Sequence, residues 1–136
     1  MRIPVTTMKT SNSQPPIKIA LVDDHSLIKK GIKLVLSFYS DIEVIGDADN
    51  GKQLLSMLTL AQPDVILLDL QMPVMDGVTT LPQLRKLYPG IKVIIFSMHN
   101  DTETVSKLLE GGAHSYLQKD SDPETIYSTI KSCYKS

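Results

Sequence analysis

The sequence predicts an α/β fold in which helices cover both faces of one doubly wound parallel sheet. Short apolar runs alternate five times with segments whose apolar residues recur every three or four positions, a pattern typical of parallel strands joined by helices. Residues 65–68 and 93–96 are apolar at every position, as expected for strands buried on both faces. Right-handed crossovers then restrict the topology to a doubly wound arrangement.

The composition fits one globular domain and excludes several classes of protein. The chain has 136 residues, 42% hydrophobic and 21% charged, so it can bury a core without disulfides or metals. The net charge of -1 gives no electrostatic footprint for nucleic acid. No apolar run approaches the roughly 20 residues that cross a membrane. The single cysteine, Cys133, is expected to be buried, and a cytoplasmic location fits this cysteine usage.

The first half of the chain is predicted to hold a lead-in, two strands and two helices. The polar residues 1–16 are expected to be disordered, and residues 17–136 to form the domain. Strands are expected at 17–22 and 42–45, a loop at 46–49, and helices at 26–38 and 52–60. The apolar side of the first helix is predicted to comprise Leu27, Ile28, Ile32, Leu34, Val35 and Phe38. Its solvated face is predicted to carry Lys29, Lys30 and Lys33.

The second half is predicted to hold three strands and three helices. Strands are expected at 65–68, 93–96 and 115–118, and helices at 78–88, 101–110 and from 121 onward. Pro82 would break a helix that began at Asp76, so we expect a start near Thr79 or a bend. Inward-facing positions of the last two helices are Val105, Leu108, Leu109, Ile126, Ile130 and Cys133. A glycine cap at 111–112 and a capping box at 121–124 are expected to bound these helices.

Polar residues follow four of the predicted strands at equivalent positions. Asp23 and Asp24 follow the first strand, Asp69 the third, Ser97 the fourth and Lys119 the fifth. In an open parallel sheet, ligands bind at this carboxyl edge. Any one of these residues alone could cap a helix or lie in solvent. Together, on one edge of one sheet, they predict a site.

The acids of this set predict a magnesium site. Adjacent strands lie about 4.8 Å apart, and three carboxylates that close repel one another unless a cation or protons compensate. Oxygen ligands favour a hard cation, and Mg²⁺ leaves coordination positions free for phosphate oxygens. The histidines, His25, His99 and His114, are scattered without a spaced partner, so no zinc site is predicted.

The same residues predict chemistry at phosphorus. A carboxylate such as Asp69, beside Mg²⁺ and the Lys119 ammonium, can attack phosphorus and form an aspartyl-phosphate. Ser97 can donate its hydroxyl to a phosphoryl oxygen. The sequence has no glycine-rich phosphate loop, which favours the protein itself as the acceptor.

Four segments resemble the receiver domain of response regulators in two-component phosphorelay signal transduction. They are LVDDH at 21–25, LLDLQMPVMDG at 67–77, FSMH at 96–99 and GGAHSYLQKD at 111–120. The opening Asp-Asp-His and the Lys-Asp after the last strand are similar to receivers of the NarL/LuxR class. The resemblance covers nearly everything after Pro16, and it implies a flavodoxin-like fold with strand order 2-1-3-4-5 and five helices.

The resemblance implies a role for each matching residue. Asp69 matches the phosphoacceptor, Asp24 the main metal-binding acid and Asp23 its support. The backbone carbonyl of Gln71 matches a further metal ligand. Ser97 and Lys119 match the phosphoryl-binding pair, and Tyr116 the switch aromatic, for which a half-buried strand tyrosine is the alternative. Ser97 stands where threonine is commoner, and Asp120 where proline is common, so no cis bond of the X-Pro kind is expected.

The resemblance also implies partners. A sensor histidine kinase would donate the phosphoryl group to a phosphoprotein that regulates transcription. Regulators of this class carry a DNA-binding domain after the receiver, and we expect that domain to have been cut from this chain. A stand-alone receiver is the alternative, no membrane contact is expected, and a homodimer is possible.

Two further interpretations stay open at this stage. One is a phosphatase-type hydrolase that forms an aspartyl-phosphate, although such enzymes usually have an acid two residues after the nucleophile, where Gln71 stands. The other is an interaction module in which the acids only cap helices. Steady turnover of a phosphomonoester would favour the hydrolase, and indifference to Mg²⁺ the module.

Overall fold

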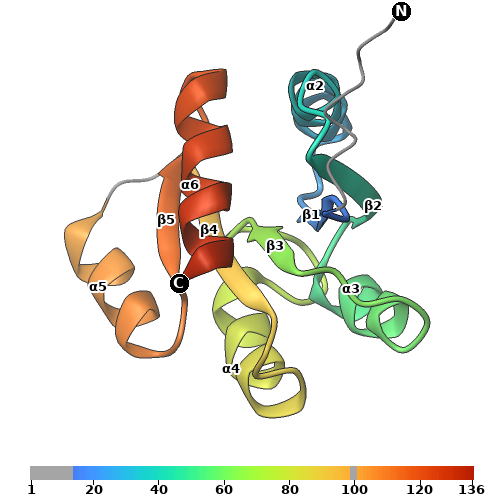
Figure 1. The fold of residues 1–136 in the computed structure, drawn as a ribbon. Helices are drawn as coiled ribbons and strands as arrows, with labels where there is room; N and C mark the ends of the chain where they lie inside the picture. The colour runs from blue at the N-terminus through green and yellow to red at the C-terminus, as the bar shows by residue number, and fades with distance from the viewer. Residues whose placement is uncertain (1–13, 99–100) are drawn as a thin grey trace, which may run out of the picture.

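A computed structural model describes residues 14–98 and 101–136 and confirms the predicted architecture (Figure 1). One five-stranded parallel sheet has the order β2-β1-β3-β4-β5. The strands are β1 (Ile17–Val22), β2 (Ile42–Ala48), β3 (Val65–Leu68), β4 (Lys92–Ser97) and β5 (Ser115–Gln118). The helices are α2 (Ser26–Leu36), α3 (Gly51–Leu58), α4 (Gly77–Leu87), α5 (Thr102–Glu110) and α6 (Pro123–Lys135). Most of the predicted lead-in, residues 1–13, and one of the three scattered histidines, His99, lie outside the described residues.

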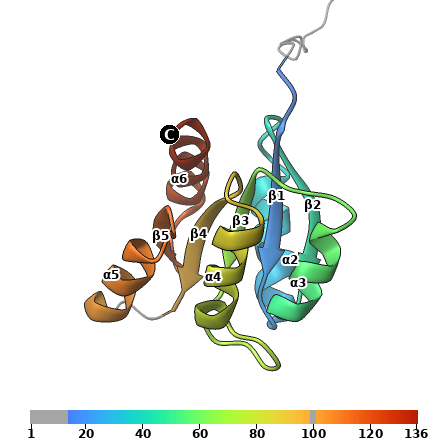
Figure 2. The same cartoon turned by 90° about the horizontal axis from the view of Figure 1, so that it is seen from below.

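The helices form two layers on opposite faces of the sheet (Figures 1 and 2). Helices α2 and α6 pack on one face, where Ile32, Leu36 and Ile130 belong to one buried cluster. Helices α3, α4 and α5 cover the other face, with Leu54, Leu84 and Leu108 in a second cluster. Burial on both faces explains why the central strands are apolar at every position.

Successive side chains of β3 divide between these two clusters. Val65 and Leu67 join the α2–α6 side, whereas Ile66 and Leu68 join the α3–α4–α5 side. The alternation follows from the period of two along a strand. Burying four such side chains stabilises the fold by about 1.5–3 kcal/mol each, so β3 is a rigid base for the residue that follows it, Asp69.

Four helices begin at a side-chain cap. Asn50, Asp76, Asp101 and Asp122 each accept a hydrogen bond from a backbone N–H in the first turn of their helices. Helix α6 therefore begins at Pro123 with Asp122 as its N-cap, and not with a capping box that starts at Ser121. Helix α2 differs, because its N-cap residue, His25, makes no side-chain capping bond. The three acids of the predicted site thus cap none of these helices, which argues against the capping interpretation.

The predicted loop at 46–49 is wrong, because β2 continues through Ala48. Ala20 pairs with Gly46 where Ile19 pairs with Val44, so Ile45 is an extra residue in the ladder. This bulge shifts by one residue the alternation of side chains between the two faces of β2. The second half of the strand therefore does not show the alternation by which a strand is predicted. The extension places Asp47 and Asp49 close to α2.

The predicted faces of two helices need correction. Lys29 is buried rather than solvated, while Leu27, Leu34 and Phe38 are exposed. Leu109, predicted to face inward, is 41% exposed. In each helix the apolar residues outnumber the positions that face the sheet, so periodicity alone could not decide which of them are buried.

The expected late start of the helix that holds Pro82 is also wrong. Helix α4 begins at Gly77, with Pro82 inside it. Proline removes the hydrogen bond that its position would donate to the carbonyl of Val78. Val78 is half exposed, so water can hydrate that carbonyl, and the Asp76 cap supports the first turn.

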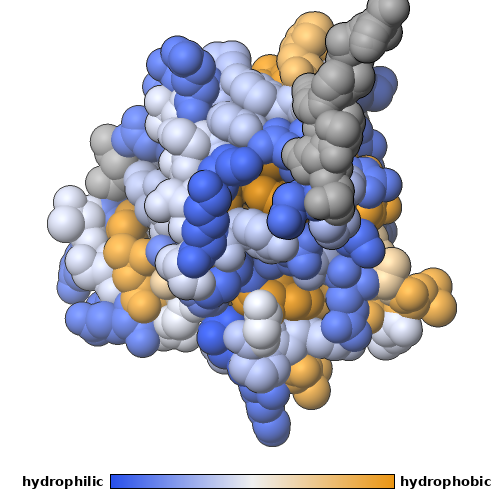
Figure 3. Space-filling model, viewed as in Figure 1, coloured by the Kyte–Doolittle hydropathy of each residue, from blue (hydrophilic) through white to orange (hydrophobic). Residues whose placement is uncertain are grey.

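The visible surface is largely hydrophilic, with apolar side chains in small separate groups (Figure 3). None of the helices in the described ranges is long and apolar enough to span a membrane. The predicted burial of the free cysteine, Cys133, is confirmed.

Candidate functional site

The polar residues predicted at the carboxyl edge of the sheet are held there by strand pairing. The backbone N–H of Asp69 donates to the carbonyl of Val22 over 2.9 Å, which aligns the ends of β3 and β1. The N–H of Lys119 donates to the carbonyl of Ser97 over 3.0 Å, which aligns β5 with β4. Residues at or just after the ends of four strands therefore meet at one edge.

Lys119 links the first and third strands of the site. Its ammonium lies 2.6 Å from Oδ2 of Asp23 and 3.1 Å from Oδ1 of Asp69. The side chain of Lys119 is 4% exposed, and both carboxylates are buried to a similar degree. Removing three charges from water can cost more than their pairing returns, so the fold maintains this geometry at a cost in stability.

Three carboxylates and one imidazole form a compact cluster. Ligand atoms of Asp23, Asp24, His25 and Asp69 all lie within 4.8 Å of one another. Oδ2 of Asp69 is buried and has no hydrogen-bond partner among the described residues. One ammonium cannot neutralise three carboxylates, and the buried oxygen needs a partner. These residues therefore fit a divalent cation with a preference for oxygen ligands.

The electrostatics distinguish the two buried acids. Burial opposes ionisation of Asp23, but hydrogen bonds from Lys119 and His25 outweigh it and hold its pKa below the usual value. Burial and the neighbouring Asp23 carboxylate raise the pKa of Asp69, and Lys119 offsets only part of this. Asp69 is thus the more basic of the pair, and a cation or a positive reaction partner favours its ionised form.

The loop after β3 is shaped around the backbone of Asp69. Gly77 donates its N–H to the carbonyl of Leu70 over 3.0 Å, and a Cβ at this glycine would meet the Asp69 carbonyl oxygen at 2.2 Å. In the loop between Leu70 and Gly77, Val74 has a φ of 70°. The N–H of Met75 donates a hydrogen bond to the carbonyl of Pro73 over 2.7 Å. A β-branched residue in this region is strained. Such strain is commonest at functional sites.

The remaining predicted site residues lie at the same edge or in the adjoining strand. Ser97 is buried at the end of β4. Gln71 is exposed in the loop after β3. Tyr116 is half buried in β5, opposite Ile95 of β4 in the sheet register, and packs against the α3–α4–α5 cluster.

Sequence reasoning missed His25 as part of this site. Its backbone N–H and its Nδ1 both contact Oδ1 of Asp23, at 2.8 and 2.9 Å, and Nδ1 lies 3.3 Å from Oδ1 of Asp24. The position directly after the acid pair was the only signal, because a turn can fold residue i+2 back onto an aspartate at i.

Lys29 was also missed, and it lies beside the cluster. Its ammonium pairs with Asp49 and lies 3.3 Å from Asp47, to which Lys33 also binds. Burial disfavours the charged ammonium of Lys29, but the hydrogen bonds to Asp49 and Asp47 outweigh it and raise its pKa. This network ties the start of α2, and hence the acid pair before it, to the end of β2.

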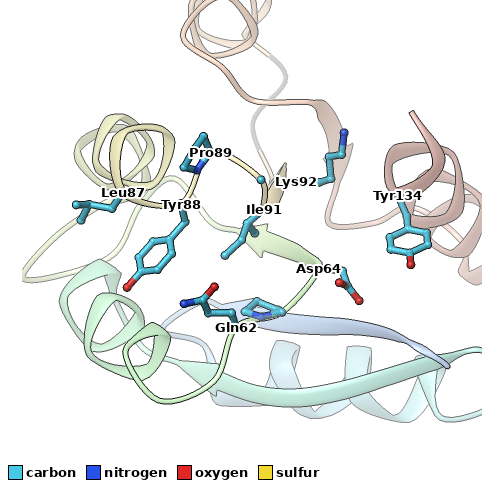
Figure 4. Close-up of a pocket in the computed structure, with 10 residues that line it drawn as sticks. Gln62, Asp64, Leu87, Tyr88, Pro89, Ile91, Lys92 and Tyr134 are labelled. Atoms are coloured by element: carbon cyan, nitrogen blue, oxygen red, sulfur yellow. The ribbon is translucent and has the colours of Figure 1, made fainter.

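A wide hollow of about 610 Å³ lies elsewhere, at the amino ends of the strands (Figure 4). Asp64, Lys92 and Tyr134 line it together with residues of the loops around 62–63 and 87–91. It is open to solvent, and among the described residues that line it Asp64 is the only acid, in contrast to the cluster at the carboxyl edge. We therefore assign the chemistry to the carboxyl edge.

The sequence of this chain is similar to those of known response regulators. The family model of the response regulator receiver domain matches residues 19–131. Over 119 residues the chain is 40% identical to the nitrate/nitrite response regulator protein NarL of Escherichia coli K12, covering 88% of this chain and 55% of that protein. It is 33% identical over 124 residues to the transcriptional regulatory protein DegU of Brevibacillus brevis, covering 91% of this chain and 52% of that protein. The chain thus spans about half the length of these relatives.

Solved structures give the same result. A signal receiver domain from Mycobacterium tuberculosis superimposes with a TM-score of 0.84 at 32% identity, covering 90% of this chain and 99% of that one. A LuxR-family two-component response regulator from Aurantimonas superimposes with a TM-score of 0.83 at 25% identity, covering 88% of this chain and 86% of that one.

Proposed function

The chain belongs to the response regulator receiver family, whose members are phosphoacceptor switches rather than catalytic enzymes, and we propose that Asp69 is the residue that accepts the phosphoryl group. The observation that carries this proposal is the buried contact of Asp69 with Lys119, inside a cluster with Asp23 and Asp24. Asp69 also directly follows β3, whose four side chains are all buried, so its position is fixed before any partner binds.

We assign the cation site to Asp24, Asp69 and the backbone carbonyl of Gln71, with Asp23 in support. Bound there, Mg²⁺ would neutralise charge on the transferring phosphoryl group. Lys119 supplies a second positive charge from a buried position, where its electrostatic attraction for the phosphoryl oxygens is stronger than it would be in water. Ser97 donates its hydroxyl to a phosphoryl oxygen.

The proposed step is one transfer without turnover. A carboxylate oxygen of Asp69 forms a bond to phosphorus while the donor's phosphorus–nitrogen bond breaks, and that electron pair stays on the departing imidazole nitrogen. The donor is a phosphohistidine of a sensor histidine kinase. Asp69 must be ionised to attack, and the Lys119 ammonium beside it favours that form.

The product acts as a switch. We propose that Ser97 is drawn to the phosphoryl group and that Tyr116, opposite Ile95 in the register, turns inward in response. In the whole protein this change would control a DNA-binding domain and thereby transcription, in the cytoplasm. The resemblance to NarL and DegU supports this output.

A small phosphodonor tests the proposal on the isolated chain. With Mg²⁺ and carbamoyl phosphate, intact-mass spectrometry should show one phosphoryl group per wild-type chain and none on Asp69→Asn. Asp120→Asn, an exposed acid at the same edge, is the matched control and should label normally. Labelling of Asp69→Asn at the wild-type rate would overturn the assignment.

A further inference from the structure

His25 adds a nitrogen to a cluster that otherwise offers oxygens. Its Nδ1 lies 2.9 Å from Oδ1 of Asp23 and 3.3 Å from Oδ1 of Asp24. The His25 side chain is 59% exposed, so its ring can adjust without disturbing the core. The buried Oδ2 of Asp69, which lacks a hydrogen-bond partner in the described part of the chain, is an independent sign that the cluster takes a ligand.

These separations suit ligands of a single ion. Neighbouring ligands of an octahedral cation with bonds of about 2.1 Å lie about 3.0 Å apart, and opposite ligands about 4.2 Å apart. The two nitrogen–oxygen distances, 2.9 and 3.3 Å, fall near the first value. The bound of 4.8 Å on the separations within the whole cluster is about 0.6 Å above the second. Imidazole nitrogen bonds transition metals well, whereas Mg²⁺ prefers oxygen.

We propose that His25 is a metal ligand through Nδ1 and makes the site bind transition-metal divalent cations, such as Mn²⁺ and Ni²⁺, in preference to Mg²⁺. This inference rests on the proposed function, since it assigns a further ligand to the same site. With the cation bound, Nδ1 gives up its contact with the carboxylates and binds through its lone pair. The backbone N–H of His25 continues to hold Oδ1 of Asp23.

Pulsed electron paramagnetic resonance of the chain with Mn²⁺ alone tests the nitrogen ligand directly. The wild type should show coupling between Mn²⁺ and a directly bound ¹⁴N, and His25→Ala should lose it. His114→Gln, at a histidine whose ring accepts the N–H of Val93 at the far end of β4, should retain it. Absence of ¹⁴N coupling in the wild type, or its persistence in His25→Ala, would overturn the proposal.

Calorimetric titration gives the second readout. His25→Ala should weaken Ni²⁺ binding by about tenfold or more and Mg²⁺ binding by less than about threefold. Equal weakening for both cations would mean that His25 only positions the acids, and the proposal would be wrong. Labelling of the wild type and of Asp69→Asn with Mg²⁺ tests the phosphoacceptor assignment separately, so this inference can fail while that assignment stands.

Discussion

The environment of Asp69 has two opposing effects on its carboxylate. Asp69 must be buried beside Asp23 to meet Lys119, yet burial and Asp23 both raise its pKa. A carboxyl group whose pKa is raised in the folded state lowers the free energy of unfolding when it is ionised, compared with when it is protonated. The stability of the fold is therefore lowered as pH rises from the unfolded value of 3.8 through the folded pKa of Asp69.

Asp69→Asn should therefore be more stable than the wild type at pH 7 without divalent cations, by on the order of 1 kcal/mol. The difference should shrink as pH falls below the unfolded value of 3.8, where Asp69 is protonated in both states. Urea unfolding at pH 7 and at pH 3.5 measures both values. A variant less stable than the wild type at pH 7 would contradict this account of the acid cluster.

Single residues show what sequence could and could not reveal about the site. Asp23, Asp69 and Lys119 were predictable because each directly follows a strand, and strand ends converge at one edge. His25 and Lys29 were not, because their roles depend on where a side chain points in three dimensions. A lysine in a helix is usually solvated, and only the unexpected length of β2 brings Asp47 and Asp49 against Lys29.

Among the elements, the β3–α4 connection has the tightest fit. Gly77 is the first residue of α4 and lies directly against the backbone of Asp69. The start of the helix and the position of Asp69 therefore both depend on this glycine. A side chain at this position would meet backbone atoms, which cannot rotate away.

Gly77→Ala should therefore destabilise the fold by about 1–3 kcal/mol or more and slow labelling, because Asp69 must shift. Gly31→Ala is the matched control. Gly31 lies inside α2 with nothing within 4 Å of an added Cβ, so alanine there should stabilise by about 0.5–1 kcal/mol. Thermal unfolding and labelling rates of both variants provide the comparison. Equal stabilisation by both alanines would refute the close approach.

Element boundaries were less predictable than element types. Strands β1, β3 and β5 match their predicted ranges, because each lies between clear breaks in the apolar pattern. The extent of β2 was not predictable, since its bulge interrupts the alternation. The start of α4 was not predictable either, because the Asp76 cap and the exposure of Val78 outweigh the cost of Pro82.

For the whole molecule, the doubly wound class followed from the number and alternation of elements, and the strand order, which is confirmed, from the receiver resemblance. The fold brings three carboxylates together at one edge of the sheet, where the single ammonium of Lys119 neutralises only part of their negative charge. Binding of a cation should therefore stabilise the entire domain, since a ligand that binds only the folded state shifts the unfolding equilibrium.

At a Mg²⁺ concentration ten times its dissociation constant, the free energy of unfolding should rise by about 1.4 kcal/mol. Asp24→Asn should lose most of this gain. Thermal melts in MgCl₂ and in NaCl of equal ionic strength separate binding from screening. An identical rise in both salts would mean that Mg²⁺ has no site.

The most direct test of the central claim is to locate the phosphoryl group on the wild-type chain. After reaction with carbamoyl phosphate and Mg²⁺, borohydride reduces an aspartyl-phosphate to homoserine, which peptide mass spectrometry assigns to a position. The account predicts modification at Asp69 alone, and none when the divalent cation is removed. Modification at Asp23 or Asp24 instead, or at Asp69 without any divalent cation, would contradict it.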